Sequence, residues 1–358
     1  MVEAAYVGNR GMWWQAGVLA NYNALTPDLL KSYGLDINSA ADRTILNAPL
    51  NSAAASPRFQ NKLPYAGFPA TSTVAQSLRP FPQFSSGLAP LWAPLGDTWY
   101  NSLQAKLTKR LSHGVDFTYN FTWSQELTIG TESDSVGPFG VAGLVNDVFN
   151  RSQNKYISAY SRPLVSNFAA NYTVPKWGKN RIVSYALSDW QIGTLLTYAS
   201  GMPIAVPGAQ NQLANQLFRG TFANRVAGQP LFTVDLNCHC YDPNTTFSLN
   251  PKAWADPSPG QWGTSTGYYD DYRQQRRPQE NLNFGRVFRF AERASLSVRA
   301  EFTNILNRTR YPAPTATNAL ATQTRNAAGL TTAGFGYMNT TTVGASGRAG
   351  QLVARFRF

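Results

Sequence analysis

Several stretches of the sequence alternate between apolar and polar residues with a period of two, which indicates β-strands whose two faces meet different surroundings. The clearest is "VDFTYNFTW" at 115–123, where the odd-numbered residues are apolar and the even-numbered residues are Asp, Thr or Asn. The stretches "NSLQAKLTKRL" at 101–111 and "ASLSVRAEF" at 294–302 follow the same rule, and 167–174, 190–198 and 282–290 follow it more weakly. Each has about the 9–11 residues that cross a bilayer as a tilted strand.

The end of the chain, "QLVARFRF", continues this alternation to its last residue. Leu352, Ala354, Phe356 and Phe358 fall on one side of an extended strand, whereas Gln351, Arg355 and Arg357 fall on the other, with Val353 as the exception. With a first strand at about 3–8, the sequence predicts about eight strands, an even number of the kind that bacterial outer-membrane barrels have.

The lengths of the links between these strands separate a membrane barrel from a soluble sandwich. Short turns are expected at 112–114 and 291–293, and a moderate link, with Pro175, Trp177 and Gly178, between 174 and 188. The links 8–97, 124–160, 201–280 and 307–347 are long and rich in Gly, Pro, Asn, Ser and Thr. In an up-and-down arrangement all long links lie at one end, as in outer-membrane barrels with short periplasmic turns and long extracellular loops.

The composition agrees with this class and argues against several others. Charged residues make up 14% of the 358 residues and aromatic residues 13%, yet no apolar run approaches the ~18 residues of a membrane-spanning helix. The net charge of +12 is scattered apart from "RQQRR" at 273–277, and no nucleic-acid-binding motif accompanies it, so no nucleic-acid partner is expected.

No catalytic, cofactor or metal site is expected from the sequence. The motifs of serine hydrolases, zinc proteases and phosphate-binding loops are missing, and the Asp270–Asp271 pair alone does not indicate a glycosidase. Cys238 and Cys240 flank His239, but His113 is the only other histidine. A pair of loop thiols, of open redox state, is therefore expected rather than a zinc site.

In the predicted barrel the polar side of each strand lines the lumen and the apolar side meets lipid. The residues expected to face the lumen are Lys106, Asp116, Arg299, Glu301, Arg355 and Arg357. The aromatic residues near strand ends that are expected to form interfacial girdles are Trp99, Tyr100, Trp123, Trp190, Tyr198, Phe356 and Phe358. The loop segment "YYDDYRQQRR" at 268–277 mixes aromatic and charged residues, and Tyr268, Tyr269, Tyr272 and Arg273 are candidate ligand contacts. The favoured alternative is that this segment is a solvated loop base.

Longer motifs resemble a known family. The segments "GDTWYNSLQAKLTKRLSHGVDFTYNFTWSQ" (96–125), "LSDWQIGTLLTYASGMPIAV" (187–206) and "RRPQENLNFGRVFRFAERASLSVRAEFTNILNRTRY" (276–311) are similar to the distal barrel of Oar-like TonB-dependent outer-membrane receptors of the acidobacterial type. The loop at 238–264 and the terminal "QLVARFRF" resemble the same family.

The resemblance implies a plugged barrel of roughly 22 strands that takes up a solute with energy from the TonB system. It also implies that the terminal aromatic strand, through Phe356 and Phe358, is read by the barrel assembly machinery. No signal peptide, TonB box or plug is recognised in residues 1–358, so the expectation is a single C-terminal segment of a receptor barrel. About eight strands would form either an incomplete curved wall or a small closed barrel, and the sequence leaves both open.

The expected function is therefore that of a non-enzymatic barrel segment of a solute receptor in the cell outer membrane, not competent alone. Its expected partners are outer-membrane lipid and the barrel assembly machinery, with the TonB system reached only through the receptor's N-terminal region. The alternative is a secreted or periplasmic all-β module that binds a ligand such as a carbohydrate on aromatic side chains.

Overall fold

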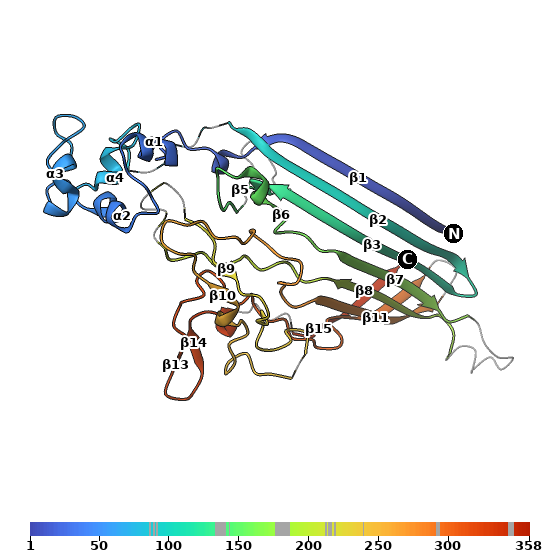
Figure 1. Cartoon of the computed structure of the whole chain (residues 1–358). Helices are drawn as coiled ribbons and strands as arrows, with labels where there is room; N and C mark the ends of the chain where they lie inside the picture. Colours follow the sequence, from blue (N-terminus) through green and yellow to red (C-terminus); the bar gives the residue numbers. More distant parts are fainter. Residues whose placement is uncertain are drawn as a thin grey trace.

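The computed structural model describes residues 1–85, 87–88, 90, 92–132, 141–142, 144–175, 187–211, 213, 217, 220–238, 240–290, 294–342 and 347–358. Its main element is one antiparallel sheet in which neighbouring strands follow each other along the chain (Figure 1). The long strands of this sheet are β1 (Val2–Gln15), β2 (Pro94–Ser112), β3 (Val115–Ile129), β7 (Leu164–Thr173), β8 (Trp190–Ala199), β11 (Arg277–Arg289), β12 (Ser295–Thr303) and β15 (Ala349–Arg357). The predicted up-and-down, all-β architecture is confirmed, and every strand expected from the alternation is present.

The sheet is open: β1 and β15 are its two ends and do not pair with each other. A short strand, β6 (Lys155–Ile157), joins it beside β3, and the bulge at 158–163 separates β6 from β7. β3 pairs with the chain on both sides of this bulge: Leu127 pairs with Ile157 of β6, and Trp123 pairs with Leu164 of β7. Of the two possibilities left open by the sequence, the structure therefore has the incomplete curved wall.

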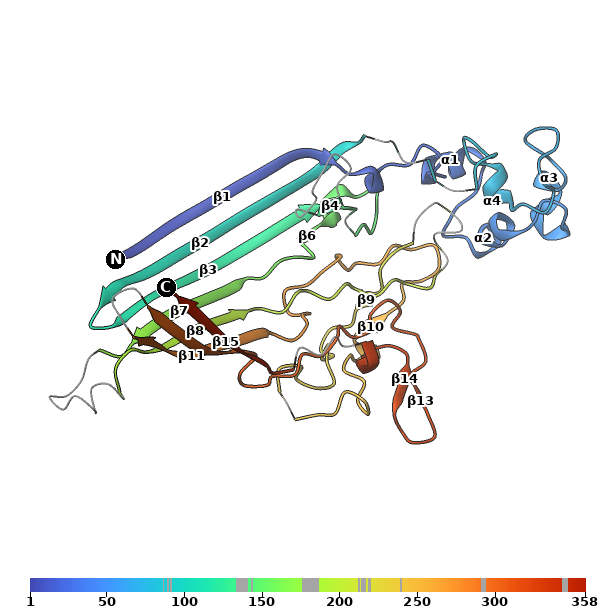
Figure 2. The ribbon, with the colours of Figure 1, turned by 180° about the vertical axis from the view of Figure 1, so that it is seen from behind.

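One end of the sheet carries the short turns. Ser112 pairs with Val115, and the two residues between them, His113 and Gly114, have φ angles of 53° and 78°. Two positive φ angles in a two-residue loop are typical of a type I′ turn, whose twist matches that of the two antiparallel strands it joins. Both chain termini lie at this end (Figures 1 and 2). The predicted turn at 291–293, as well as Trp177 and Gly178 of the moderate link, lie outside the described residues.

The other end carries the long links, which fold into structured loops (Figure 2). The first link contains the helices α1 (Pro27–Ser32), α2 (Ala40–Asn47), α3 (Ser56–Phe59) and α4 (Val74–Ser77). Thr26, Ser39 and Thr73 cap α1, α2 and α4 by accepting a backbone N–H through their hydroxyl groups. Leucines of this link, among them Leu30, Leu46 and Leu50, form a core that also includes Leu213 and Leu217 of a later loop.

The remaining loops contain short strands and 3₁₀ helices. The strands are β4 (Thr131–Glu132), β5 (Val141–Ala142), β9 (Asn224–Arg225), β10 (Trp254–Ala255), β13 (Thr324–Arg325) and β14 (Thr331–Ala333). The 3₁₀ helices are Gly17–Leu19, Ala53–Ala55, Arg151–Asn154, Pro251–Ala253 and Thr340–Thr342. A second apolar core, around Leu249, Tyr272 and Phe335, holds these loops together. None of the described helices has the length and hydropathy needed to span a membrane.

The two faces of the sheet differ in chemistry. Residues paired directly across neighbouring strands share a face, and the register places Tyr119 opposite Leu107 on one side and Phe168 on the other. The apolar face stays open to its surroundings, with exposures of 72% for Tyr6, 59% for Trp123 and 82% for Leu352. A sandwich would bury such a face against a second sheet, whereas an outer-membrane barrel turns it to lipid.

Candidate functional site on the concave face

All six residues predicted to face the lumen lie on the same face of the sheet. The register shows this by direct pairing along one row, in which Asp116, Asn171, Gly193, Asn283, Glu301 and Gln351 follow each other across β3, β7, β8, β11, β12 and β15. Lys106 is placed on this face by its pairing with Asn120. Arg299 is an even number of residues from Glu301, and Arg355 and Arg357 from Gln351, which leaves them on the same side of their strands.

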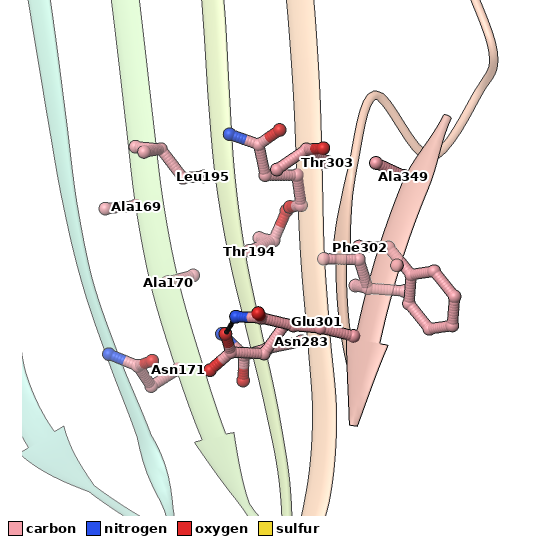
Figure 3. A pocket seen from close by; sticks show the side chains of 14 residues that line it. Ala169, Ala170, Asn171, Thr194, Leu195, Asn283, Glu301, Phe302, Thr303 and Ala349 are labelled. Carbon is pink, nitrogen blue, oxygen red and sulfur yellow. Dashed lines mark hydrogen bonds between the residues drawn. The ribbon is translucent and has the colours of Figure 1, made fainter. Parts of the chain in front are cut away.

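This polar face is the concave side of the sheet. A hollow of about 600 Å³ extends across β7, β8, β11, β12 and β15, and Asn171, Asn283, Glu301 and Gln351 line it. Figure 3 shows the side chains of Asn171, Asn283 and Glu301 at about the same level of the sheet. A hollow that touches five neighbouring strands requires a surface that curves inward, so the apolar face is the convex one.

Gly193 allows the amides of the row to converge. A Cβ atom at this position would meet the side-chain amide of Asn283 and would lie 2.9 Å from Oδ1 of Asn171. Because Gly193 has no side chain, the amide groups of Asn171 on β7 and Asn283 on β11 reach across β8 from both sides. The centre of the row therefore consists of the Gly193 backbone and two side-chain amides, with the carboxylates of Asp116 and Glu301 on either side.

Hydrogen bonds orient both ends of the row. Asn171 Nδ2 donates to Asp116 Oδ2 at 3.2 Å. At the other end, Gln351 Nε2 donates to Glu301 Oε2 at 2.6 Å, the dashed line in Figure 3. Arg299 forms an ion pair with the other carboxylate oxygen of Glu301 at 2.5 Å. This ion pair is partly exposed and contributes little stability in water, so it can exchange for contacts with a polar solute at small cost.

Lys106, Arg355 and Arg357 lie further along the concave face. Lys106 Nζ is 3.9 Å from a carboxylate oxygen of Glu3 on β1, and both side chains are about half exposed. Arg355 and Arg357 are exposed near the turn end of β15. The concave face thus presents both signs of charge together with neutral amides, which suits the recognition of a polar solute through several weak contacts.

The predicted ligand loop is packed into the second apolar core, which includes Tyr272 and has Tyr269 packed against it. Tyr272 has no exposed surface, and its ring lies 5.3 Å from that of Trp254 and 5.5 Å from that of Phe232. Burial raises its pKa above the ordinary tyrosine value, so the ring stays neutral and packs as an apolar group. The ring of Tyr268 lies 5.8 Å from that of Tyr156, with the two planes tilted by 51°.

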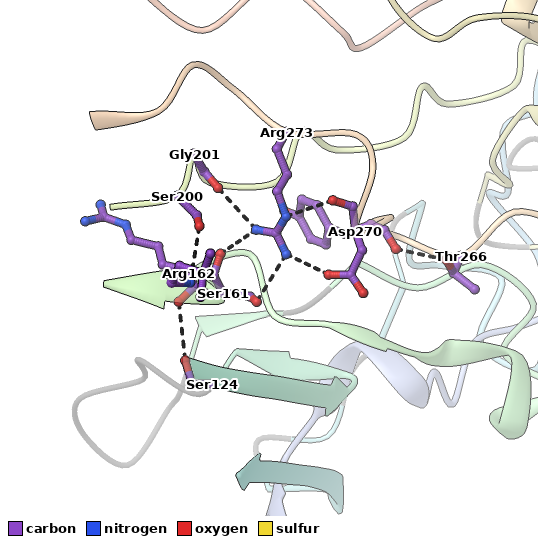
Figure 4. A network of polar contacts seen from close by, with 10 residues as sticks. Ser124, Ser161, Arg162, Ser200, Gly201, Thr266, Asp270 and Arg273 are labelled. Atoms are coloured by element: carbon purple, nitrogen blue, oxygen red, sulfur yellow. Dashed lines mark hydrogen bonds and ion pairs between the residues drawn. The ribbon is translucent and has the colours of Figure 1, made fainter. Parts of the chain in front are cut away.

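Arg273 joins three segments through its guanidinium group (Figure 4). Its Nη1 donates to the carbonyl oxygens of Ser161 at 2.7 Å and Gly201 at 3.1 Å, and Nη2 pairs with Asp270 Oδ1 at 2.8 Å. Arg273 thereby fixes the bulge between β6 and β7 to the long loop that follows β8. Tyr269 lies beneath the guanidinium of Arg225. These contacts are structural, and a role of the four residues toward a ligand stays a prediction.

The aromatic residues near strand ends gather at two levels of the convex face. Trp99, Trp123 and Tyr198 lie toward the loop end, whereas Trp190 and the stacked pair Phe356 and Phe358 lie toward the turn end. Tyr100 differs from the expectation, because its pairing with Glu126 places it on the concave face. Phe358 is 98% exposed at the end of β15, where it is accessible to another protein.

Sequence reasoning missed Gly193, Asn171 and Asn283 as parts of the site. Their strands alternate less regularly than β3, and only the register between β7, β8 and β11 brings the three together. The sequence did contain a signal for two of them, because Asn171 and Asn283 are polar residues on the polar side of the stretches 167–174 and 282–290. Cys238 and Cys240 form a disulfide in the loop region, and His239 lies outside the described residues.

A family model described as "Outer membrane beta barrel domain" matches residues 1–351. Searches of the curated proteins and of the solved structures found no significant match to this chain. The match covers nearly the entire sheet and agrees with its antiparallel order, its exposed apolar convex face and its polar concave face. The chain therefore belongs to the outer membrane β-barrel domain family and is located in the outer membrane.

Proposed function

We propose that the chain forms part of the barrel wall of a TonB-dependent receptor of the Oar-like type, and that the polar row around Gly193 is part of its solute path. The observation that carries this proposal is the hollow on the concave face, which Asn171, Asn283 and Glu301 line with amide and carboxylate groups. The motifs at 96–125, 187–206 and 276–311, which resemble the distal barrel of such receptors, support it further.

The open edges of the sheet support a wall larger than these strands. One side of β1 and one side of β15 have no strand partner among the described residues. In a bilayer each unpaired backbone group costs several kcal/mol, so open edges of this kind favour pairing with further strands of a larger wall. A wider barrel would turn the concave row toward a water-filled or plugged lumen, as in transporters of roughly 22 strands.

In this proposal the chain has no enzymatic role and needs no cofactor. The loop end provides the outward-facing surface, and the concave row provides weak, exchangeable contacts for a polar solute. Energy reaches the barrel through a region that contacts TonB and is separate from this sheet. Phe356 and Phe358, exposed at the end of β15, serve as the signal for the assembly machinery.

The test is the retention of the native polypeptide by TonB. Outer membranes from the source organism are solubilised in mild detergent and passed over the immobilised periplasmic domain of its TonB protein, and an antibody against the loop at 238–264 detects the chain. We expect retention that free TonB domain competes away. A polypeptide that is recovered in the outer-membrane fraction but is not retained, while other receptors of the same membrane are, would contradict the proposal.

A further inference from the structure

A second hollow, of about 410 Å³, lies on the convex face at the loop end of the sheet. Its floor is a row of directly paired residues on four strands, with Phe121, Ser166, Tyr198 and Pro278 in neighbouring positions. The small Ser166 lies between the two aromatic rings, which leaves a depression that Leu164 borders toward the loops. This hollow opens away from the concave site and toward the lipid-facing side.

The rim of this hollow is basic and polar. Arg276, Arg308, Asn237 and Gln275 line its loop side, and no acidic residue is among the described residues that line it. Arg310 borders it as well, because its Nη2 donates to the carbonyl oxygen of Pro278 at 3.3 Å.

Two of the basic residues are held in place by the surrounding structure. Asn237 Oδ1 accepts the backbone N–H of Arg276 at 2.9 Å. Arg308 donates through Nε to the buried carboxylate of Glu280 at 2.7 Å, and its backbone N–H donates to Asn304 Oδ1 at 2.8 Å. Glu280 therefore offsets one positive charge of the rim, while Arg276 and Arg310, both exposed, add two more.

We propose that this hollow binds a lipid of the outer leaflet whose phosphate-bearing head group has a net negative charge. Arginine side chains are well suited to phosphate oxygens, and basic pockets at the membrane surface bind anionic head groups. The head group would lie against Arg276, Arg308 and Arg310, and an acyl chain would run over Ser166 between Phe121 and Tyr198. A water-soluble anion fits less well, because the floor of the hollow is apolar and belongs to the face that meets hydrocarbon.

This proposal depends on the location in the outer membrane and not on the receptor role. The experiment uses the full chain, purified from outer membranes in a zwitterionic detergent, and measures binding of a short-chain phosphatidylglycerol through intrinsic tryptophan and tyrosine fluorescence. Phosphatidylcholine of the same chain length and inorganic phosphate are measured in parallel. We expect saturable binding of phosphatidylglycerol and much weaker binding of the other two.

Two kinds of variant separate the head-group contacts from the acyl site. The pair Arg276→Gln and Arg310→Gln should weaken phosphatidylglycerol binding about fivefold for each arginine removed. Arg58→Gln with Lys62→Gln removes the same charge in the distant first loop and should leave binding unchanged. Ser166→Phe fills the depression and should abolish binding, whereas Ala170→Phe, on the same face of β7 but outside this hollow, should not.

Three outcomes would overturn the proposal. Equal affinity for phosphatidylglycerol and phosphatidylcholine, which both carry a phosphate, would show that the arginines do not select a net negative head group. Inorganic phosphate that binds as tightly as the lipid would mark a simple anion site. Unchanged binding in the Arg276 and Arg310 variant or in Ser166→Phe, with normal heat-modifiable mobility on gels, would show that the lipid lies elsewhere.

Discussion

At the scale of single residues, Gly193 determines whether the polar row is open. The amides of Asn171 and Asn283 occupy the volume that a side chain at this position would need. We expect Gly193→Val to force both amides aside and to destabilise the folded chain by about 1–3 kcal/mol, the usual cost of overpacking. Denaturant unfolding of the chain in lipid vesicles, followed by tryptophan fluorescence, measures this change in the free energy of unfolding.

The matched control is Gly220→Val, because a Cβ at Gly220 has no neighbouring atom within 4 Å. Its effect should stay within about 0.5 kcal/mol, as for exposed substitutions. The solute-path proposal adds a second expectation: Gly193→Val, but not Gly220→Val, should slow solute uptake by the native receptor. A Gly193→Val chain as stable as the unchanged one would show that the row relaxes freely and has no fixed shape.

At the scale of strands, β3 tests the assignment of the two faces. Tyr119 and Asn120 are adjacent, but their side chains point to the convex and concave faces, respectively. We expect Tyr119→Arg to lower the free energy of unfolding in lipid vesicles by about 2–4 kcal/mol, since the guanidinium group would then lie in hydrocarbon. Asn120→Arg introduces the same group on the polar side and should cost less than about 1 kcal/mol. Equal losses in both variants would contradict a lipid-facing convex surface.

The strands were also the most predictable part of the molecule. Regular alternation placed β12, β15 and the start of β3 within a few residues, because each strand separates two media and its alternate residues are suited to one medium or the other. The first strand continues to Gln15, well beyond the predicted 3–8, across a segment where Trp13 has a φ angle of 58° and the pairing register shifts. Between the predicted end and this irregularity, Asn9, Arg10 and Gly11 pair regularly but include no apolar residue, so the alternation stops before the strand does.

The loops and the site were less predictable for a different physical reason. Helices α1, α2 and α4 are short, and their stability comes from the shared leucine core rather than from a long amphipathic repeat. Their caps at Thr26, Ser39 and Thr73 were the readable signals. The polar row depends on which residues of β7, β8 and β11 lie opposite each other, and that register is set by links and neighbours that no single strand encodes.

At the scale of the whole molecule, the open sheet leads to a prediction about its edges. In an antiparallel strand half of the backbone N–H groups point toward each neighbour, so those of β1 that point away from β2 lack a strand partner among the described residues. β1 is fourteen residues long, and a flat unpaired edge of this length is a template for pairing with another strand. The same argument applies to the outer edge of β15.

Hydrogen exchange read by mass spectrometry distinguishes the possible states of these edges. In the isolated chain in detergent, peptides from β1 and β15 should exchange their outward amide hydrogens quickly, while β7 and β8, paired on both sides, should be protected. In native outer membranes both edge strands should become as slow as β8 if, as proposed, further strands complete the wall. Protection of both edges in the isolated chain would instead mean that β1 and β15 pair with each other, which would close a small barrel, remove the wide lumen and exclude the proposed solute path.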